Sequence, residues 1–299
     1  LRPAILWNDG RSEEQCRTLE STVTKARVIT GNLVMPGFTA PKLLWVKENE
    51  PDIFKQVDKV LLPKDYLRYK LTGEFASDMS DSAGTSWLNT GERSWSKSML
   101  MACGLSEKHM PTLYEGNEIT GYLTAKTAKR WGMKAVPVVA GAGDNAAGAV
   151  GCGIVDAGQA MLSLGTSGVY FAVTNDYRSD PESAVHSFCH AVGHRWHLMS
   201  VMLSAASCLD WFAKNSGYSS VAELFDDVVN NTRPDDPNTP FFLPYLTGER
   251  TPHNNPNAKA GFFGLTASTT RAHMAQAVVQ GVSMALADGI DAVHGCGIQ

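Results

Sequence analysis

Long apolar runs and an excess of basic residues are both absent from this sequence, and each absence removes a class of protein. No stretch approaches the roughly eighteen apolar residues that a membrane-spanning helix needs, so we expect no membrane partner. The 26 lysines and arginines are outnumbered by 30 aspartates and glutamates, for a formal net charge of −4. Because a nucleic-acid-binding surface requires a positive footprint, we expect no nucleic acid partner either.

Cysteines with the paired spacing of a disulfide framework or a zinc site are absent as well. The six cysteines are scattered, which is typical of reduced thiols, so we expect a cytoplasmic protein. Hydrophobic residues make up 43% and charged residues 19%, which are values of a globular protein. A length of 299 residues predicts two domains. The cysteines are Cys16, Cys103, Cys152, Cys189, Cys208 and Cys296.

Strand-like and helix-like segments follow one another along the chain, which predicts an α/β fold. We expect short strands at 4–7, 60–62 and 136–140, a loop over 78–88, and alternating strands and turns over 160–203. We expect helices from Glu13 to about 20, at 40–58, from Pro63 to 71, near 94–102 and 124–131, and at 145–154, 204–216, 220–231 and 271–294.

The segment 136–151 is the most informative one, because a short strand ends at a Gly-Ala-Gly turn and a small-residue helix follows. Asp144 stands at this break, beside Asn145. A carboxylate near a helix N-terminus is favoured as the anion, which suits a general base held in an open site. The alternative is that Asp144 only caps the helix.

A second segment, 160–173, is predicted to form a strand, a tight turn and another strand. The turn is Gly165-Thr166-Ser167-Gly168. Glycine lets backbone N–H groups approach an anion closely, and the hydroxyls add donors, so such a turn can bind a phosphate. Taken alone, it is better explained by an ordinary hairpin with a glycine-rich turn. With Asp144 upstream, a phosphoryl-transfer site becomes the better interpretation.

Five potential metal ligands crowd the segment 186–197, but strand geometry argues against a metal site. Alternation along 187–192 places neighbouring side chains on opposite faces, whereas zinc needs convergent ligands. We therefore expect a hairpin with half-exposed histidines and no metal. The five residues are His186, Cys189, His190, His194 and His197.

The chain resembles the FGGY family of carbohydrate kinases over nearly its whole length. Residues 37–49 look like the family's first signature, and residues 260–280 look like its second. The Gly-Asp-Asn and Gly-Thr-Ser turns occur in the matching order and spacing. Residues 7–11 and 244–252 resemble those members of the family that phosphorylate D-xylulose.

This resemblance implies a two-domain, actin-like or ribonuclease-H-like α/β fold with the active site between the domains. It implies that 1–153 is the remainder of a sugar-binding N-terminal domain, and that 154–299 is the first part of a nucleotide-binding C-terminal domain. The family's N-terminal Asp-x-Gly-Thr hairpin, its Met-His sugar contact and its C-terminal adenosine loop are not found. We therefore expect a fold that is incomplete at both ends, and no activity from these residues alone.

The resemblance also assigns roles to residues. Asp144 is implied to be the catalytic base, and ATP is implied as phosphate donor together with Mg²⁺, for which this chain supplies no direct protein ligand. The implied sugar contacts are Trp7, Asn8, Asp9 and Asn145, and the implied ATP phosphate contacts are Gly165, Thr166, Ser167 and Ala206.

Several residues near the expected site can instead have a purely structural role. Trp7 can be an aromatic plug in a turn, and Ser204 can cap the helix that follows it. Glu249 and Arg250 can hold a polar loop at the active site or form a salt-bridged anchor.

The function that these expectations add up to is ATP-dependent phosphorylation of D-xylulose to D-xylulose 5-phosphate. One alternative is a related kinase for another ketose or a polyol, and a second is a non-catalytic sugar-binding protein on the same scaffold. The sequence leaves the oligomeric state open, with a homodimer as one alternative.

Overall fold

The computed structural model describes residues 2–298, which form two compact units. Leu1 and Gln299, the outer ends of the two expected domains, lie outside the described residues. The first unit contains the chain up to Gln159 together with Val173–Pro181 and His186–Leu198. The second contains Ala160–Ala172, Glu182–Val185 and the chain from Met199 onward. The chain therefore passes from one unit to the other inside strands as well as between them.

Helices at the start of the first unit enclose a hydrophobic core that includes Leu19, Trp87 and Leu100. The helix predicted over 40–58 is wrong as a single element, because Pro51 lacks the N–H that would continue it. The chain forms two helices there instead. The elements around this core are η1 (Gly10–Ser12), α1 (Glu13–Thr22), α2 (Ala26–Thr30), α3 (Thr39–Asn49), α4 (Pro51–Phe54), α7 (Lys97–Ala102) and η2 (Glu107–His109).

Residues 60–89 differ most from expectation. Helix α5 (Pro63–Thr72) ends as predicted at Gly73, whose φ of 85° suits glycine. The loop predicted over 78–88 is wrong, because Asp78 accepts from the N–H of Asp81 and thereby caps a short helix. The strands expected at 4–7 and 60–62 do not form. The elements here are β1 (Ala76–Asp78), which pairs in parallel with β4 (Thr112–Tyr114), α6 (Met79–Ala83), and the pair β2 (Leu88–Asn89) and β3 (Ser94–Trp95).

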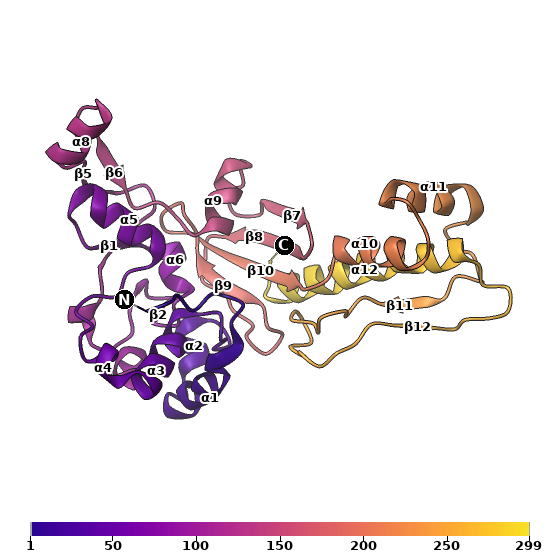
Figure 1. Cartoon of the computed structure of the whole chain (residues 1–299), viewed down its shortest axis with the longest axis horizontal. Helices are drawn as coiled ribbons and strands as arrows, with labels where there is room; N and C mark the ends of the chain where they lie inside the picture. The colour runs from indigo at the N-terminus through magenta and orange to yellow at the C-terminus, as the bar shows by residue number, and fades with distance from the viewer. Residues whose placement is uncertain (1, 299) are drawn as a thin grey trace. The chain divides into compact units, whose positions relative to one another are not determined.

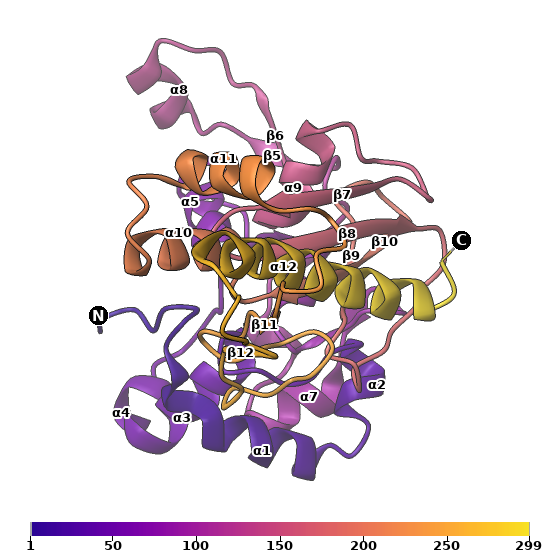
Figure 2. The same cartoon turned by 90° about the vertical axis from the view of Figure 1, so that its right-hand side faces the viewer.

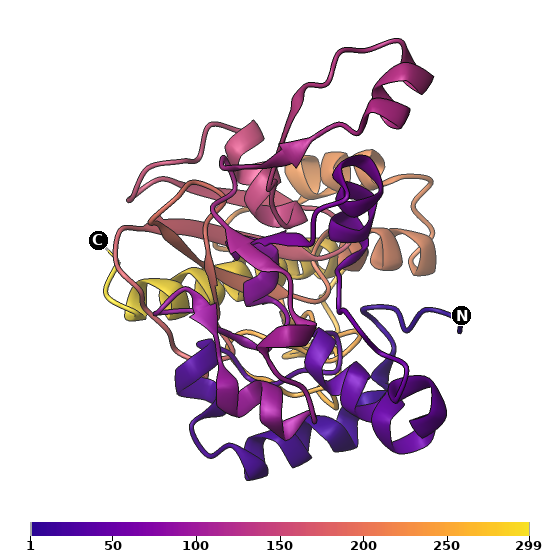
Figure 3. The ribbon, with the colours of Figure 1, turned by 90° about the vertical axis from the view of Figure 1, so that its left-hand side faces the viewer.

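The strand, turn and helix predicted around Asp144 are confirmed. Strand β6 (Pro137–Val139) pairs antiparallel with β5 (Ile119–Tyr122), and α9 (Asp144–Gly151) follows the turn. Helix α8 (Ala125–Trp131) lies between the two strands in sequence. Figure 3 shows this helix, in magenta, extending away from the indigo helices of the same unit.

A four-stranded sheet has the order β7-β8-β10-β9, where β7 is Ala160–Leu164, β8 is Gly168–Thr174, β9 is His186–Cys189 and β10 is Trp196–Met202 (Figure 1). Strands β7 and β8 pair antiparallel, with Leu164 opposite Gly168. This register closes the predicted hairpin at residues 165–167.

The β9–β10 hairpin is confirmed, but three of its four histidines are not half-exposed as expected, while His194 in the turn is exposed. His186, His190 and His197 are all buried. Nδ1 of His186 lies 3.1 Å from Oδ1 of Asn32, and Nε2 of His190 lies 3.2 Å from the carbonyl of Ile154. Packing against elements distant in sequence thus covers them, and burial lowers the pKa of His190. Within residues 2–298 no three or more His, Cys, Asp or Glu side chains form a group that could hold a metal ion.

The long helix α12 (Arg271–Gly295) organises the second unit and matches the predicted span closely. Its small residues allow close approach: a Cβ on Gly281 would lie 2.2 Å from the carbonyl oxygen of Phe242, and one on Gly289 would lie 2.7 Å from Oγ of Ser200. Figure 2 shows α12 running alongside α10. The other elements are α10 (Ala206–Asn215), α11 (Val221–Asn231) and the antiparallel pair β11 (Phe241–Leu243) and β12 (Gly261–Phe263).

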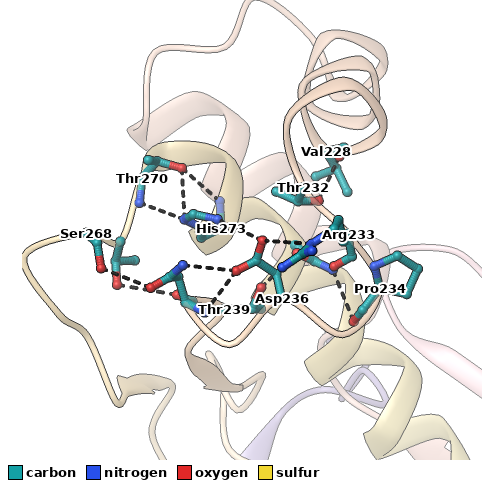
Figure 4. Close-up of polar contacts among 12 residues, drawn as sticks. Val228, Thr232, Arg233, Pro234, Asp236, Thr239, Ser268, Thr270 and His273 are labelled. Atoms are coloured by element: carbon teal, nitrogen blue, oxygen red, sulfur yellow. Dashed lines mark hydrogen bonds and ion pairs between the residues drawn. The ribbon is translucent and has the colours of Figure 1, made fainter.

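Polar contacts fasten the start of α12 to the loop that leaves α11 (Figure 4). Thr270 and His273 form a reciprocal capping box, in which each side chain accepts from the other's backbone N–H. Nε2 of His273 also lies 3.5 Å from the carboxylate of Asp236. Gln276 donates to the carbonyl of Arg233 and accepts from the hydroxyl of Thr239. No helix in the described part of the chain combines the length and apolarity needed to cross a membrane.

Candidate active site

Asp144 is the first residue of α9, and its side chain is exposed. Gly143 occupies the capping position, so the alternative that Asp144 is only an N-cap is wrong. Oδ1 of Asp144 accepts from the backbone N–H of Asn145 at 2.8 Å and lies 3.3 Å from that residue's Nδ2. A carboxylate in the first turn of a helix is stabilised as the anion. The geometry thus presents an exposed carboxylate beside an amide.

The turn that delivers Asp144 requires glycine at one position in particular. Gly141 has a φ of 81°, a conformation that side chains with a Cβ rarely adopt. The backbone N–H groups of Ala140 and Gly141 donate to the carbonyls of Glu118 and Gly116 at 2.9 Å each. Backbone pairing therefore continues from the end of β6 into the turn.

The turn at 7–9 exposes an aromatic face. The Trp7 side chain is 76% exposed, so the alternative that it is a plug is wrong. Asp9 binds Arg11 through its side chain, with Nε–Oδ2 at 2.9 Å, and accepts from the Arg11 backbone N–H. These bonds lower the pKa of the Asp9 carboxyl. Arg11 in turn lies over the ring of Trp45, 5.0 Å from its centroid.

Within the described residues no hydrogen bond or ion pair joins Trp7, Asn8 or Asp9 to Asp144 or Asn145. Asn8 is exposed, like Trp7. The three residues follow no strand, because 4–7 does not form one. Their expected role in sugar binding therefore rests on the exposure of Trp7 and Asn8 and on the family resemblance.

The Gly-Thr-Ser turn and the start of α10 are held together in the second unit. Gly165, Thr166 and Ser167 are exposed. The carbonyl of Thr166 accepts from the N–H of Ala205 at 2.9 Å, and the carbonyl of Gly165 accepts from the N–H of Ala206 at 3.0 Å. Ala206 is thus adjacent to the turn, and its own N–H already donates to it.

The hydroxyls near this turn have different surroundings. Oγ of Ser207 donates to the carbonyl of Thr166 at 2.8 Å. Ser204 does not cap α10: its Oγ lies 3.0 Å from Oγ1 of Thr247, and Ala205 is the capping residue. The exposed hydroxyls of Thr166 and Ser167 make no hydrogen bond within residues 2–298, which leaves them available to an anion.

Glu249 anchors a loop at the end of β10. Its side chain is buried, and Oε1 accepts from the N–H groups of Leu203 at 2.9 Å and Arg250 at 2.7 Å. Burial raises the pKa of this carboxyl. Backbone donors therefore hold Glu249 in place, where the sequence suggested a salt bridge as one alternative.

Sequence reasoning missed a group of charged residues beside the Asp144 turn. Lys64 contacts the carboxylates of Asp65, Asp78 and Asp81, and Arg68 also binds Asp65. The signal was present in the Asp78-x-x-Asp81 spacing, because an Asp three residues before another acidic residue is a helix-start pattern. Interpreting 78–88 as a loop concealed it.

Comparison with known proteins now identifies the family. Residues 1–151 match the FGGY family of carbohydrate kinases, N-terminal domain, and residues 160–299 match the C-terminal domain of the same family. The chain belongs to the FGGY family of carbohydrate kinases, as its sequence motifs predicted.

Individual relatives agree. A protein of Escherichia coli (strain K12) named xylulose kinase is 66% identical over 100% of this chain and 61% of its own length. A solved structure described as a xyloylose kinase from Brucella ovis is 50% identical, with a TM-score of 0.95 over 100% of this chain and 61% of that one. The xylulose kinase structure from Rhodospirillum rubrum is 26% identical, with a TM-score of 0.91 over 99% and 61%.

These matches confirm the predicted α/β, two-domain, actin-like fold. The chain spans about three fifths of the length of the relatives it matches.

Proposed function

We propose that this chain is part of an enzyme that phosphorylates D-xylulose to D-xylulose 5-phosphate with ATP. The observation that carries the proposal is the 66% identity, over the whole of this chain, to a protein named xylulose kinase. The similarity to the Brucella ovis structure, at 50% identity, supports it further.

In the proposed reaction Asp144 accepts the proton of the sugar's terminal hydroxyl as that oxygen attacks the γ-phosphorus. Its exposure at the start of α9, where an anion is favoured, supports this role. Asn145 orients a neighbouring hydroxyl, and Trp7, Asn8 and Asp9 contact the sugar. The exposed indole of Trp7 supports a stacking contact with a sugar face.

Gly165, Thr166 and Ser167 bind the ATP phosphates in this proposal, and Ala206 contributes by holding the turn. Their exposure and the unengaged hydroxyls support it. Mg²⁺ bound with ATP would supply positive charge near the phosphates, since phosphoryl transfer depends chiefly on positioning and charge stabilisation. We assign the sugar site to 1–153 and the nucleotide site to 154–299. We further propose that the enzyme is cytoplasmic and forms a homodimer, and light scattering measures its oligomeric state.

A substrate panel tests the proposal. The protein expressed from its complete gene is assayed for ADP release with D-xylulose, other ketoses, polyols and no sugar. We expect D-xylulose to give the highest kcat/KM, with a product phosphorylated at C5 by NMR. Preference for another sugar would show that the protein is a related kinase. Sugar binding without ADP release would show that it is a non-catalytic sugar-binding protein.

A further inference from the structure

A buried network of charged and hydroxyl side chains lies beside the turn that carries Asp144, all within the first unit. It comes from α5, β1 and α6. Asp65 and Asp78 are fully buried, and Ser80 and Arg68 are each 5% exposed. Burying this many polar groups is costly unless each has a partner, so their arrangement requires a reason.

Ser80 makes the first contact between this network and the turn. Its Oγ donates to Oδ2 of Asp78 at 2.5 Å and accepts from the backbone N–H of Gly143 at 3.0 Å. Because the hydroxyl proton is committed to Asp78, a lone pair of the same oxygen faces Gly143. Gly143 directly precedes Asp144, so this bond fixes the backbone from which the carboxylate projects.

Arg68 makes the second contact, three residues earlier. Its Nη1 donates to the carbonyl of Ala140 at 2.5 Å, and its Nη2 donates to the carbonyl of Ala76 at 2.7 Å and to Asp65. A planar guanidinium can hold two carbonyls and a carboxylate at fixed angles. The turn is therefore held at both ends, by Arg68 at Ala140 and by Ser80 at Gly143.

Lys64 keeps the acidic members of the network in place. Its Nζ lies 2.7 Å from Asp65, 2.5 Å from Asp78 and 3.3 Å from Asp81. Asp78 also accepts from the N–H of Asp81 at 3.0 Å. Asp78 is thus held by the Lys64 ammonium group and by the backbone N–H of Asp81, and in this position it accepts the hydroxyl proton of Ser80.

We propose that Ser80 and Arg68, oriented by Asp78 and Asp65, are positioning residues that set where the Asp144 carboxylate stands during phosphoryl transfer. The inference rests on the proposed function of Asp144. Asp144 itself is exposed, and within residues 2–298 its side chain forms hydrogen bonds only with the adjacent Asn145. Its position therefore depends on its backbone, and a shift of about 1 Å at a reacting group can cost about 100-fold in rate.

A double-mutant cycle tests the proposal in the protein expressed from its complete gene. We expect Ser80→Ala to lower kcat about 10- to 100-fold, with a small change in the KM for sugar. In an Asp144→Asn background the same substitution should change kcat by less than about threefold, because Ser80 acts through Asp144. Ser80→Thr, which keeps the hydroxyl, should restore most of the rate.

Ser96→Ala is the matched control. Ser96 is 8% exposed, starts a helix of the same unit, and its Oγ likewise accepts a backbone N–H, that of Met99. It should lower Tm about as much as Ser80→Ala while leaving kcat unchanged. Equal kcat values for the two variants, or an undiminished effect of Ser80→Ala without Asp144, would overturn the inference.

Hydrogen exchange gives a readout that does not depend on catalysis. The Gly143 amide should exchange about tenfold faster in Ser80→Ala than in the wild type or in Ser96→Ala, because it loses its acceptor. Unchanged exchange would refute the geometry. If Asp144→Asn itself turned over at the wild-type rate, the proposed function would fail instead, so the two failures are distinguishable.

Discussion

Asp144 is the side chain on which the proposed reaction depends most directly. Asp144→Asn keeps the size and the hydrogen bond to Asn145 but removes the base, so kcat should fall about 10²- to 10⁴-fold. The KM for sugar should change little. Asp52→Asn is the control, because Asp52 is also an exposed acid in a first helical turn, where its partner is Lys55. Steady-state kinetics on both variants measure the difference. A wild-type kcat for Asp144→Asn would show that Asp144 is not the catalytic base.

Thr166 makes a distinct prediction, because its exposed hydroxyl is expected to face phosphate. Thr166→Val should weaken ATP binding by the free energy of a hydrogen bond to a charged group, about 1.5–3 kcal/mol. The KM for ATP should therefore rise about 10- to 150-fold. The KM for sugar should be unaffected. Thr22→Val, at an exposed position in the last turn of α1, serves as the control. A change confined to the sugar KM would assign this turn to the sugar site.

Helix α6 carries a carboxylate that opposes folding at neutral pH. Burial raises the pKa of Asp81 from 3.8 to about 6, in spite of the nearby Lys64. Between about pH 4 and pH 6, the Asp81 carboxyl therefore keeps its proton in the folded protein but has lost it in the unfolded chain. The resulting loss of stability is absent below the unfolded pKa, grows as pH rises from about 4 to 6, and is complete above that range.

Asp81→Asn should accordingly stabilise the protein at about pH 8 and have less effect at about pH 4. Urea unfolding at the two pH values measures the difference. Asp58→Asn, a change on an exposed residue of the same unit, controls for the change in net charge. A variant that was less stable at pH 8 would show that the ion pair with Lys64 outweighs the burial of Asp81.

Helix α12 can approach β11 only because Gly281 has no side chain. Gly281→Ala places a Cβ 2.2 Å from the Phe242 carbonyl, so the helix or the strand must move. Overpacking of this kind costs about 1–3 kcal/mol, seen as a lower Tm. Gly295→Ala on the same helix meets nothing within 4 Å, and should be neutral or stabilising by up to about 1 kcal/mol.

How well each element could be predicted depends on how local its causes are. Helix α12 and the Asp144 strand-turn-helix follow from periodicity and glycine placement, and both were predicted correctly. The strand at 4–7 was wrong because an apolar run also needs a partner strand, and no described strand pairs with it. The burial of His190 and His197 depends on packing from residues far along the chain, which alternation alone cannot indicate.

The candidate site divides in the same way. Asp144 and the Gly-Thr-Ser turn could be found from local pattern and family resemblance. The Ser80 and Arg68 contacts could not, because each joins residues more than sixty positions apart. Only the three-dimensional fold brings these partners together.

Thiol reactivity is a property of the molecule as a whole. All six cysteines are free, and four of them are buried. Burial raises the pKa of Cys16, Cys189 and Cys208 to about 12 and that of Cys103 to about 11. Thiols that stay protonated react slowly, so only Cys152 and, more slowly, Cys296 should react at pH 8.

Titration with a disulfide reagent measures this directly. One or two thiols should react in the native state and all six of this chain after unfolding, and a reducing agent should leave Tm unchanged. Rapid reaction of four or more thiols in the native protein would contradict the buried positions described here.

The first unit is discontinuous in sequence, and this has a consequence for synthesis on the ribosome. Asn32 and Ile154 bind the β9 segment through Ser187, His186 and His190, so a nascent chain of about 160 residues still lacks part of that unit's interior. Final packing of the first unit must wait until Leu198 has left the exit tunnel, by which time the first strands of the second unit have also emerged. The first unit therefore finishes folding only after synthesis of the second has begun, and no single cut in the gene separates them.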